Sequence, residues 1–224
     1  MATKNWNDDF MSQLIDEQAW KELSQDFLWS EQLLEKYADK VDWHEVSGNN
    51  QMLWTASMLE KFKKRIDWRE LSGTGHQSLL NAEMLARFEQ YWDWHEVSGN
   101  NEMLWTASML EKFKKRIDWR ELSGTGHQYL LNAEILARFE QYWDWHVLSD
   151  NSSLELSHEL LDKFIERWDW REIIGRWDDA LFDEGFLERY KEHIPASELQ
   201  NSRLWDKIVE KRKMLLANQI AAAV

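Results

Sequence analysis

The chain contains no cysteine, a single proline (Pro195) and only eight glycines among its 224 residues. The absence of cysteine excludes disulfides, cysteine-based zinc sites and thiol chemistry. So little proline and glycine leaves almost no material for flexible linkers or disordered segments. We therefore expect a chain that is ordered nearly throughout.

Long hydrophobic runs are absent as well. No stretch approaches the roughly eighteen apolar residues of a membrane-spanning helix. The opening residues, MATKNWNDD, also lack the apolar core of a signal peptide. We therefore expect a soluble, cytoplasmic protein with no membrane partner.

Positive charge is in deficit, because 27 Lys and Arg face 41 Asp and Glu and the formal net charge is −14. A strongly acidic protein repels the phosphate backbone of nucleic acids. Nucleic acid is therefore disfavoured as a partner unless one face gathers the basic side chains.

Tryptophan is what the chain has in excess. It carries 16 tryptophans, where about three are ordinary for this length, so these rings are expected to share a repeated packing role. Comparing the chain with itself explains the excess, because residues 43–93 recur at 94–144 with three changes. They are Gln51 to Glu102, Ser78 to Tyr129 and Met84 to Ile135.

Each of these blocks contains the same theme twice, which gives a tandem unit of about 25 residues. The theme is Trp, a basic residue, usually Glu, an aliphatic residue and Ser, then a polar loop and a second apolar segment. A looser copy begins at Trp20 and a degenerate eighth near Ala196. The clear units begin at Trp43, Trp68, Trp94, Trp119, Trp145 and Trp170.

The second segment of each unit predicts a helix. Its apolar residues in one copy are Met58, Leu59, Phe62 and Ile66, which form one stripe on a helix. One slot before the stripe holds residue types that cap helix N-termini with their side chains. These expected caps are Ser30, Thr55, Asn81, Thr106, Asn132, Ser157 and Asp183.

The Trp segment predicts a shorter helix that begins after an aspartate. Glu follows three residues after that aspartate in most copies, although Val147 replaces it in one. We interpret this pair as a variant of the capping box, in which the Glu side chain reaches back to the amide of the capping residue. The aspartates are Asp42, Asp67, Asp93, Asp118, Asp144 and Asp169, and the glutamates are Glu45, Glu70, Glu96, Glu121 and Glu172.

Two helices per unit make a helical hairpin that buries its apolar faces only by stacking on its neighbours. The sequence therefore predicts an all-α fold, an α-solenoid of about seven to eight helix-turn-helix units. We expect a single helical-repeat domain over 1–224, with an N-terminal cap at 1–19, Trp repeats at 20–195 and a C-terminal capping unit and helix at 196–224.

The repeat resembles the uncharacterised tryptophan-rich short helical repeats of bacterial and large-virus proteins. The resemblance is carried by segments such as WHEVS (43–47), MLEKF (58–62) and the following Asp67-Trp68, and it covers about residues 20–195. More distantly the chain is similar to tetratricopeptide-like α-solenoids, although its unit is shorter and Trp opens the short helix. The resemblance implies a binding surface and no particular chemistry.

Catalytic and metal-binding patterns are missing from the sequence. No histidine pair has the i, i+4 spacing of a helical metal site, and the HExxH and GxSxG patterns do not occur. Gly73-Thr74-Gly75 and its copy at 124–126 lack the Lys and the preceding strand of a phosphate-binding loop, so we interpret them as turns. We expect no enzyme, no cofactor and no metal.

The residue after each opening Trp is basic or protonatable. A positive charge is unfavourable at a helix N-terminus, so something must offset it. One hypothesis is a ladder of ion pairs with acidic residues of the adjacent unit; the other is a basic ribbon that binds an anionic peptide, a nucleotide or an acidic partner. The residues are Lys21, His44, Arg69, His95, Arg120, His146 and Arg171.

Two further features have alternative interpretations. We expect the opening tryptophans to form a stacked inner core; an exposed aromatic platform is the alternative. The polar loops are displayed on a rigid scaffold and are candidate contacts for a partner, although drift of surface residues would explain them equally. These loop residues are His76, Gln77, His127, Gln128 and Tyr129.

From these patterns we expect a non-enzymatic binding scaffold whose solenoid face engages a protein or peptide. The first alternative is a protein that sequesters a small anionic ligand such as a nucleotide signal in a phage or host-defence setting. The second is an architectural protein that self-associates through its exposed ends.

Overall fold

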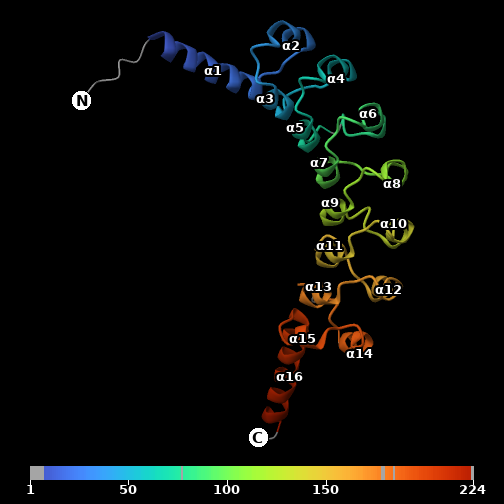
Figure 1. Cartoon of the computed structure of the whole chain (residues 1–224). Coiled ribbons are helices and arrows are strands. Elements are labelled where there is room, and N and C mark those ends of the chain that lie inside the picture. The colour runs from blue at the N-terminus through green and yellow to red at the C-terminus, as the bar shows by residue number, and fades with distance from the viewer. Residues whose placement is uncertain (1–7, 77, 178–179, 184, 223–224) are drawn as a thin grey trace, which may run out of the picture. The chain divides into compact units, whose positions relative to one another are not determined.

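The structure, a computed structural model, describes residues 8–76, 78–177, 180–183 and 185–222. The chain forms two compact units, residues 1–118 and 119–224. Within the described residues there are sixteen helices and no strand (Figure 1). This confirms the predicted all-α solenoid.

In the first unit, short helices alternate between two kinds. The Trp-initiated helices are α3 (Trp43–Gly48), α5 (Trp68–Gly73) and α7 (Trp94–Gly99). The second helices of the hairpins are α2 (Glu31–Tyr37), α4 (Ala56–Phe62), α6 (Ala82–Arg87) and α8 (Ala107–Phe113). The longer α1 (Asp8–Asp26) precedes them, so the expected N-terminal cap and the start of the first repeat share one helix.

The second unit repeats this arrangement. Its Trp-initiated helices are α9 (Trp119–Gly124), α11 (Trp145–Asp150) and α13 (Trp170–Gly175). Its second helices are α10 (Ala133–Arg138), α12 (His158–Lys163) and α14 (Phe186–Tyr190). The short α15 (Ala196–Leu199) and the long α16 (Arg203–Ala221) follow.

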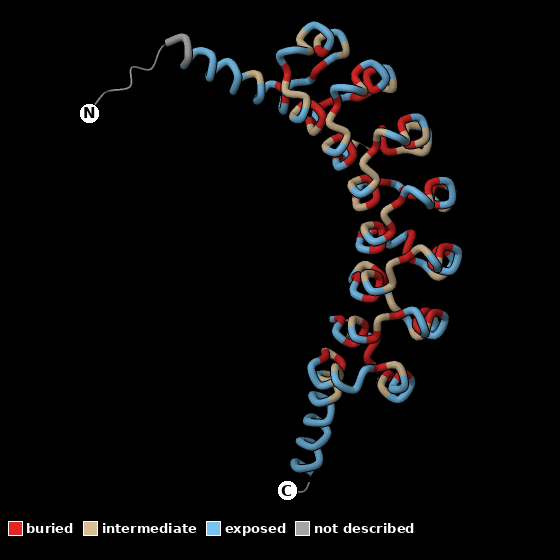
Figure 2. The backbone as a smooth tube through the Cα atoms, in the orientation of Figure 1, coloured by how far each residue is buried: buried red, intermediate tan, exposed pale blue. Residues whose placement is uncertain are grey.

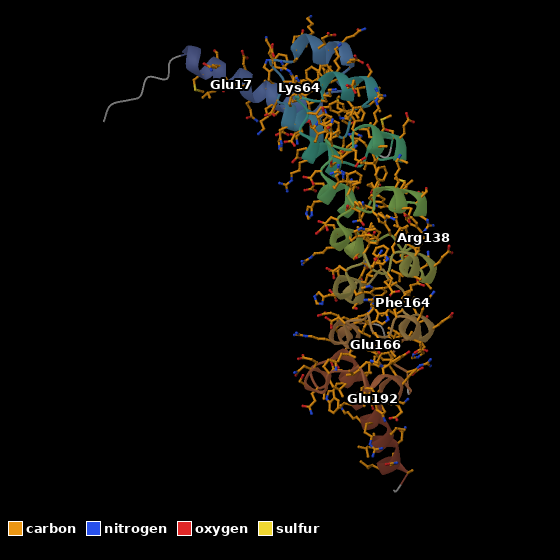
Figure 3. All side chains as sticks on the ribbon, turned by 45° about the vertical axis from the view of Figure 1, so that its right-hand side comes forward. Glu17, Lys64, Arg138, Phe164, Glu166 and Glu192 are labelled. Atoms are coloured by element: carbon orange, nitrogen blue, oxygen red, sulfur yellow. The ribbon has the colours of Figure 1, made fainter. Side chains whose placement is uncertain are left out.

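Within each unit the two kinds of helix form two rows (Figure 1). In the first row α3 packs on α1 and α5, and α5 packs on α7; in the second unit α11 packs on α9 and α13. Buried residues concentrate where the rows face each other, as Figure 2 shows. Phe164 lies among the side chains that fill this space (Figure 3).

The opening tryptophans join the two rows. The Trp43 ring packs on Phe62 of the same hairpin with 5.1 Å between ring centroids, and Trp94 packs on Phe113 in the same way at 5.2 Å. The Trp43 indole N–H donates to the Ala38 carbonyl, 2.8 Å away, just past α2. The expected packing role is confirmed, but the partners of these rings are mainly Phe and Tyr, so they do not form one continuous stack of tryptophans.

The helix caps agree with the sequence pattern. Ser30, Thr55, Asn81, Thr106, Asn132 and Ser157 each accept a backbone amide of the helix that follows. The expected cap at Asp183 was wrong: α14 begins later, at Phe186, and its N-cap is Gly185, which makes no side-chain cap bond. The Asp183 carboxylate accepts the Gly185 amide at 2.9 Å instead. The predicted caps are therefore confirmed in six hairpins and wrong in the last.

A buried serine links successive repeats of about 25 residues. The Ser47 hydroxyl donates to the Trp43 carbonyl at 2.6 Å and accepts the Asp67 amide at 2.9 Å. We call these contacts the serine joints. The same acceptor role is filled by Ser24, Ser72, Ser98, Ser123 and Ser149 toward Asp42, Asp93, Asp118, Asp144 and Asp169.

The serine joints correct the predicted capping box. A backbone amide has one hydrogen, and the amide of each capping aspartate donates it to the serine of the preceding unit. The glutamate therefore cannot use that amide. The aspartates cap as expected: Asp67 accepts the Arg69 amide at 3.1 Å.

A second buried contact follows alternate Trp-initiated helices. The Asn49 amide group donates to the carbonyls of Ser24 and Phe27, at 3.0 and 2.9 Å. We call these the asparagine joints. Asn100 and Asn151 repeat the contact on Ser72 and Thr74 and on Ser123 and Thr125.

The last seam is built differently. Ile174 occupies the serine slot and is fully buried, and Pro195 occupies the slot of the donating aspartate. Proline has no amide hydrogen, so the donor and the acceptor of the serine joint are both missing here. In the asparagine slot Arg176 donates to the carbonyls of Ser149, Asn151 and Leu154.

Among the described residues, no helix combines the length and the apolar character that crossing a membrane requires.

Candidate functional site

The basic residues that follow each opening Trp lie at exposed positions along the first row. Their side chains reach to the acidic residues of the following unit. We call this set of ion pairs the ladder. Its pairs are Lys21–Glu45 (3.4 Å), His44–Asp67 (3.0 Å), Arg69–Glu96 (3.0 Å), His95–Asp118 (3.1 Å), His146–Asp169 (2.8 Å) and Arg171–Glu198 (3.6 Å).

The ladder uses two kinds of acceptor. The histidines contact the capping aspartate of the next helix, whereas Arg69 contacts the glutamate three residues further along. The remaining member of the basic series, Arg120, is exposed on α9. Since a carboxylate lies within 4 Å of each charged group in the six pairs, a bound anion would have to compete with it.

The pairing shifts the titration of both partners. The hydrogen bond to Asp67 raises the pKa of His44, and the same bond lowers the pKa of Asp67. His146 behaves alike, because its hydrogen bond to Asp169 raises its pKa. Burial opposes the lowered pKa of Asp169, but hydrogen bonds from His146 and two backbone amides outweigh it.

Within the second unit, one step of the ladder has the residue types of a metal site. In the second unit, His146, Asp169 and Glu172 each place one ligand atom within 4.8 Å of the others. The His146 side chain is about two-thirds exposed, and one oxygen of Asp169 accepts the Arg171 amide as a helix cap. The distance of 2.8 Å between His146 Nδ1 and the Asp169 carboxylate is that of an ordinary hydrogen bond, so we interpret this step as part of the ladder.

The loop residues Gln128 and Tyr129 line a groove of about 540 Å³ in the second unit. Its other wall comes from the next hairpin, through Ser153, Glu155 and α12. Leu131 and Leu160 are buried beneath it. The groove therefore lies between two successive hairpins, beside their second helices. Its floor is apolar and its rim is polar.

The rim of this groove combines aromatic surface with charge. Tyr129 is 52% exposed. Glu155 and Glu159 are exposed on the opposite side, and the Lys163 ammonium donates to the Ala133 carbonyl at 3.1 Å. An aromatic ring and two carboxylates that line one groove suit a ligand that carries apolar and basic groups.

The histidines of the same loops have a packing role. His76 is half-buried, its Nε2 lies 3.2 Å from the Asn49 carbonyl oxygen, and burial lowers its pKa. His127 is buried, and its ring lies 5.5 Å from that of Tyr129. Gln77 lies outside the described residues.

The turn at Gly73-Thr74-Gly75 borders a shallow hollow of about 290 Å³. Its walls include Glu70 and Glu96, and its one cation, Arg69, is paired with Glu96. Two carboxylates against one arginine make this hollow unsuitable for phosphate.

A polar cluster at α12 and α14 breaks the repeat. His158 replaces the alanine that follows the cap in the four units before it, and its ring nitrogens lie 3.0 Å from the Tyr190 hydroxyl and 3.0 Å from Asp183. The Tyr190 hydroxyl lies 3.1 Å from Asp162, which Arg189 also contacts. The sequence analysis did not identify this cluster, although the replacement of alanine by His158 was a signal in the sequence that could have found it.

The titration of this cluster argues against a nucleophile. Burial, with the hydrogen bond to Asp162, raises the pKa of Tyr190 to about 12. A nucleophilic tyrosine would need a lowered pKa. We interpret the cluster as a set of polar contacts that hold α12 and α14 together.

The sequence found Tyr129 and Gln128 but missed the opposite wall, Glu155, Glu159 and Lys163. These side chains come from a different hairpin, and only the stacking of the units brings them to the groove.

Compared with known proteins, the chain matches no family model, no curated protein and no solved structure.

Proposed function

We propose that this protein is a non-enzymatic scaffold that binds an extended segment of a protein or peptide. The groove lined by Tyr129 and α12 is the observation that carries the proposal. Its volume of about 540 Å³ is of the size that accommodates one or two side chains of a ligand.

The chemistry of the groove defines the preferred ligand. Tyr129 offers an exposed ring on the loop before α10, and exposed tyrosines dominate many binding surfaces. Glu155 and Glu159 favour a basic side chain on the ligand, whereas the buried leucines favour an apolar neighbour. The bound segment therefore carries adjacent apolar and basic residues.

The ladder supports this proposal over the hypothesis of a small anionic ligand. The side chains of six members of the basic series each lie within 4 Å of a carboxylate. An anion would lose affinity to this competition, while the groove is acidic at its rim and attracts cationic groups.

The proposal is tested with peptides selected from a displayed random library and then measured by fluorescence anisotropy. Tyr129→Ser should weaken the selected peptide by at least about tenfold, the usual effect of losing an aromatic anchor. The matched control is Ser78→Tyr, because position 78 is the copy of position 129 in the first unit, and it should leave affinity unchanged.

Enriched peptides should share adjacent apolar and basic residues. Selection that enriches no peptide, or peptides that bind Tyr129→Ser as tightly as the unaltered chain, would contradict the proposal. A nucleotide that raises the melting temperature in a thermal-shift screen would favour the anionic-ligand hypothesis instead.

A further inference from the structure

The two longest helices, α1 and α16, extend beyond the helices they pack against. Each has 19 residues. One end of α1 packs against α3, where Ser24 is buried, whereas residues 11–19 are almost wholly exposed (Figure 2). In the same way Leu204 is buried while residues 209–222 are exposed.

The exposed part of α1 has an apolar face with acidic charge. Met11, Leu14 and Ile15 are spaced i, i+3 and i+4, so they lie on one face, and Ile15 is 62% exposed. Glu17 lies on this exposed part of the helix (Figure 3). Over residues 11–26 four carboxylates accompany one lysine, which gives a net charge of −3.

The exposed part of α16 has a matching apolar face with the opposite charge. Val209, Leu216 and Ile220 are spaced i, i+7 and i+11 and lie on one face, and Ile220 is 70% exposed. Arg212 and Lys213 lie on the same face, at i+3 and i+4 from Val209, so positive charge interrupts this stripe. Over residues 203–221 five basic residues accompany two carboxylates, which gives a net charge of +3.

We propose that α1 of one copy of this protein packs against α16 of a second copy. Each helix leaves an apolar stripe in water, which marks an interaction surface. The opposite net charges favour the α1–α16 pair over α1–α1 or α16–α16, because like charges would repel. A second copy of the chain is therefore the occupant that both faces fit.

The contact is heterologous, since each copy contributes two different surfaces. A copy engaged through α1 still presents α16, so association either closes into a ring of two or more copies or continues to further copies. This proposal is independent of the groove at Tyr129 and stands whether or not that groove binds a peptide.

The test measures mass by light scattering after size exclusion, over a series of protein concentrations. The mass of the unaltered chain should rise with concentration and fall when salt screens the charges. Two variants block one face each: Leu14→Asp with Ile15→Asp on α1, and Leu216→Asp with Ile220→Asp on α16. All four positions are exposed, so circular dichroism should show an unchanged helix content.

Each variant alone should remain monomeric, because its intact face lacks a partner. An equal mixture of the two should form dimers and nothing larger, through the intact α16 of one and the intact α1 of the other. Arg212→Glu with Lys213→Glu provides a second block of α16 that alters charge alone, and it should also abolish association.

Other outcomes would overturn the proposal. A mass equal to one chain at every concentration would exclude association between copies. An α1 variant that still dimerises alone would show α16–α16 pairing, and the converse result would show α1–α1 pairing. Binding of α16 to anionic lipid vesicles, without any self-association, would assign its apolar stripe to a membrane surface.

Discussion

Two sets of contacts connect each repeat to the next, and they differ in exposure. The serine and asparagine joints are buried: Ser72 and Asn49 are at most 1% exposed. The ladder runs over the same steps, but its basic side chains are more than half exposed. Exposed pairs contribute little to stability, whereas a buried polar group that loses its partner is costly. The buried joints should therefore hold the register of the units.

The largest effect that would sharpen this comparison is expected for Asn49→Asp. The variant replaces a donor with a carboxylate facing the Ser24 and Phe27 carbonyls. A buried charge without a partner should cost about 3 kcal/mol or more. Chemical denaturation followed by tryptophan fluorescence measures the loss. Asn50→Asp is the control, since Asn50 is adjacent and exposed; equal losses in the two variants would show that the asparagine joint does not matter.

A smaller effect is expected for Ser72→Ala. Removing the hydroxyl leaves the Asp93 amide and the Trp68 carbonyl without this partner in a buried seam. The expected loss is about 2 kcal/mol, measured by the same denaturation. Ser78→Ala removes a hydroxyl at an exposed position and should have almost no effect. If Ser72→Ala matched that control, the comparison between buried joints and exposed ladder would break.

The smallest effect is expected in the ladder, and it depends on pH. A histidine whose pKa is raised in the folded state adds to the free energy of unfolding. This contribution is complete below the pKa of the unfolded chain, about 6.5, and is lost as the pH rises through the folded pKa. An aspartate whose pKa is lowered in the folded state stabilises the fold above the pKa of the unfolded chain, about 3.9. That contribution is lost as the pH falls through the folded pKa. The His44–Asp67 and His146–Asp169 pairs should thus contribute most between these values.

The measurement is the melting temperature of the unaltered chain minus that of His44→Gln with His146→Gln. This difference should be small and positive near about pH 5.5 and should fade by about pH 8.5. Arg69→Gln is the control, because arginine does not titrate in this range and its difference should be constant. A difference for the histidine variant that does not change with pH would contradict the assignment.

The fold was largely predictable because its determinants are local. Caps such as Thr55 and stripes such as Met58 to Phe62 are visible within one segment, and the repeat multiplies the signal. The serine of each unit was visible as a repeated residue, but its partner amide lies about twenty residues away. That long-range contact is why the capping-box prediction for Glu45 and its copies was wrong.

The candidate groove was only half predictable. Tyr129 stood out as a change between two near-identical copies, yet Glu159 and Lys163 gave no sign that they face it. A site formed between stacked hairpins depends on the distance between units, and no pattern within one unit encodes that distance. The interactions of His158 with Tyr190 and Asp183 were hidden for the same reason.

The coupled replacement of serine by Ile174 and of the donating aspartate by Pro195 has a consequence for how the array can lengthen. A repeat added after this seam would bring a serine hydroxyl or an aspartate amide that finds no hydrogen-bond partner at Ile174 or Pro195. Residues 174 and 195 would therefore have to change together. Lengthening is therefore easiest in the interior, where every copied unit carries both halves of the bond. The near-identical blocks 43–93 and 94–144 lie in that interior. Each block contains one asparagine of the asparagine joints, Asn49 or Asn100, and one Gly-Thr-Gly turn, so the unit of duplication is a pair of hairpins.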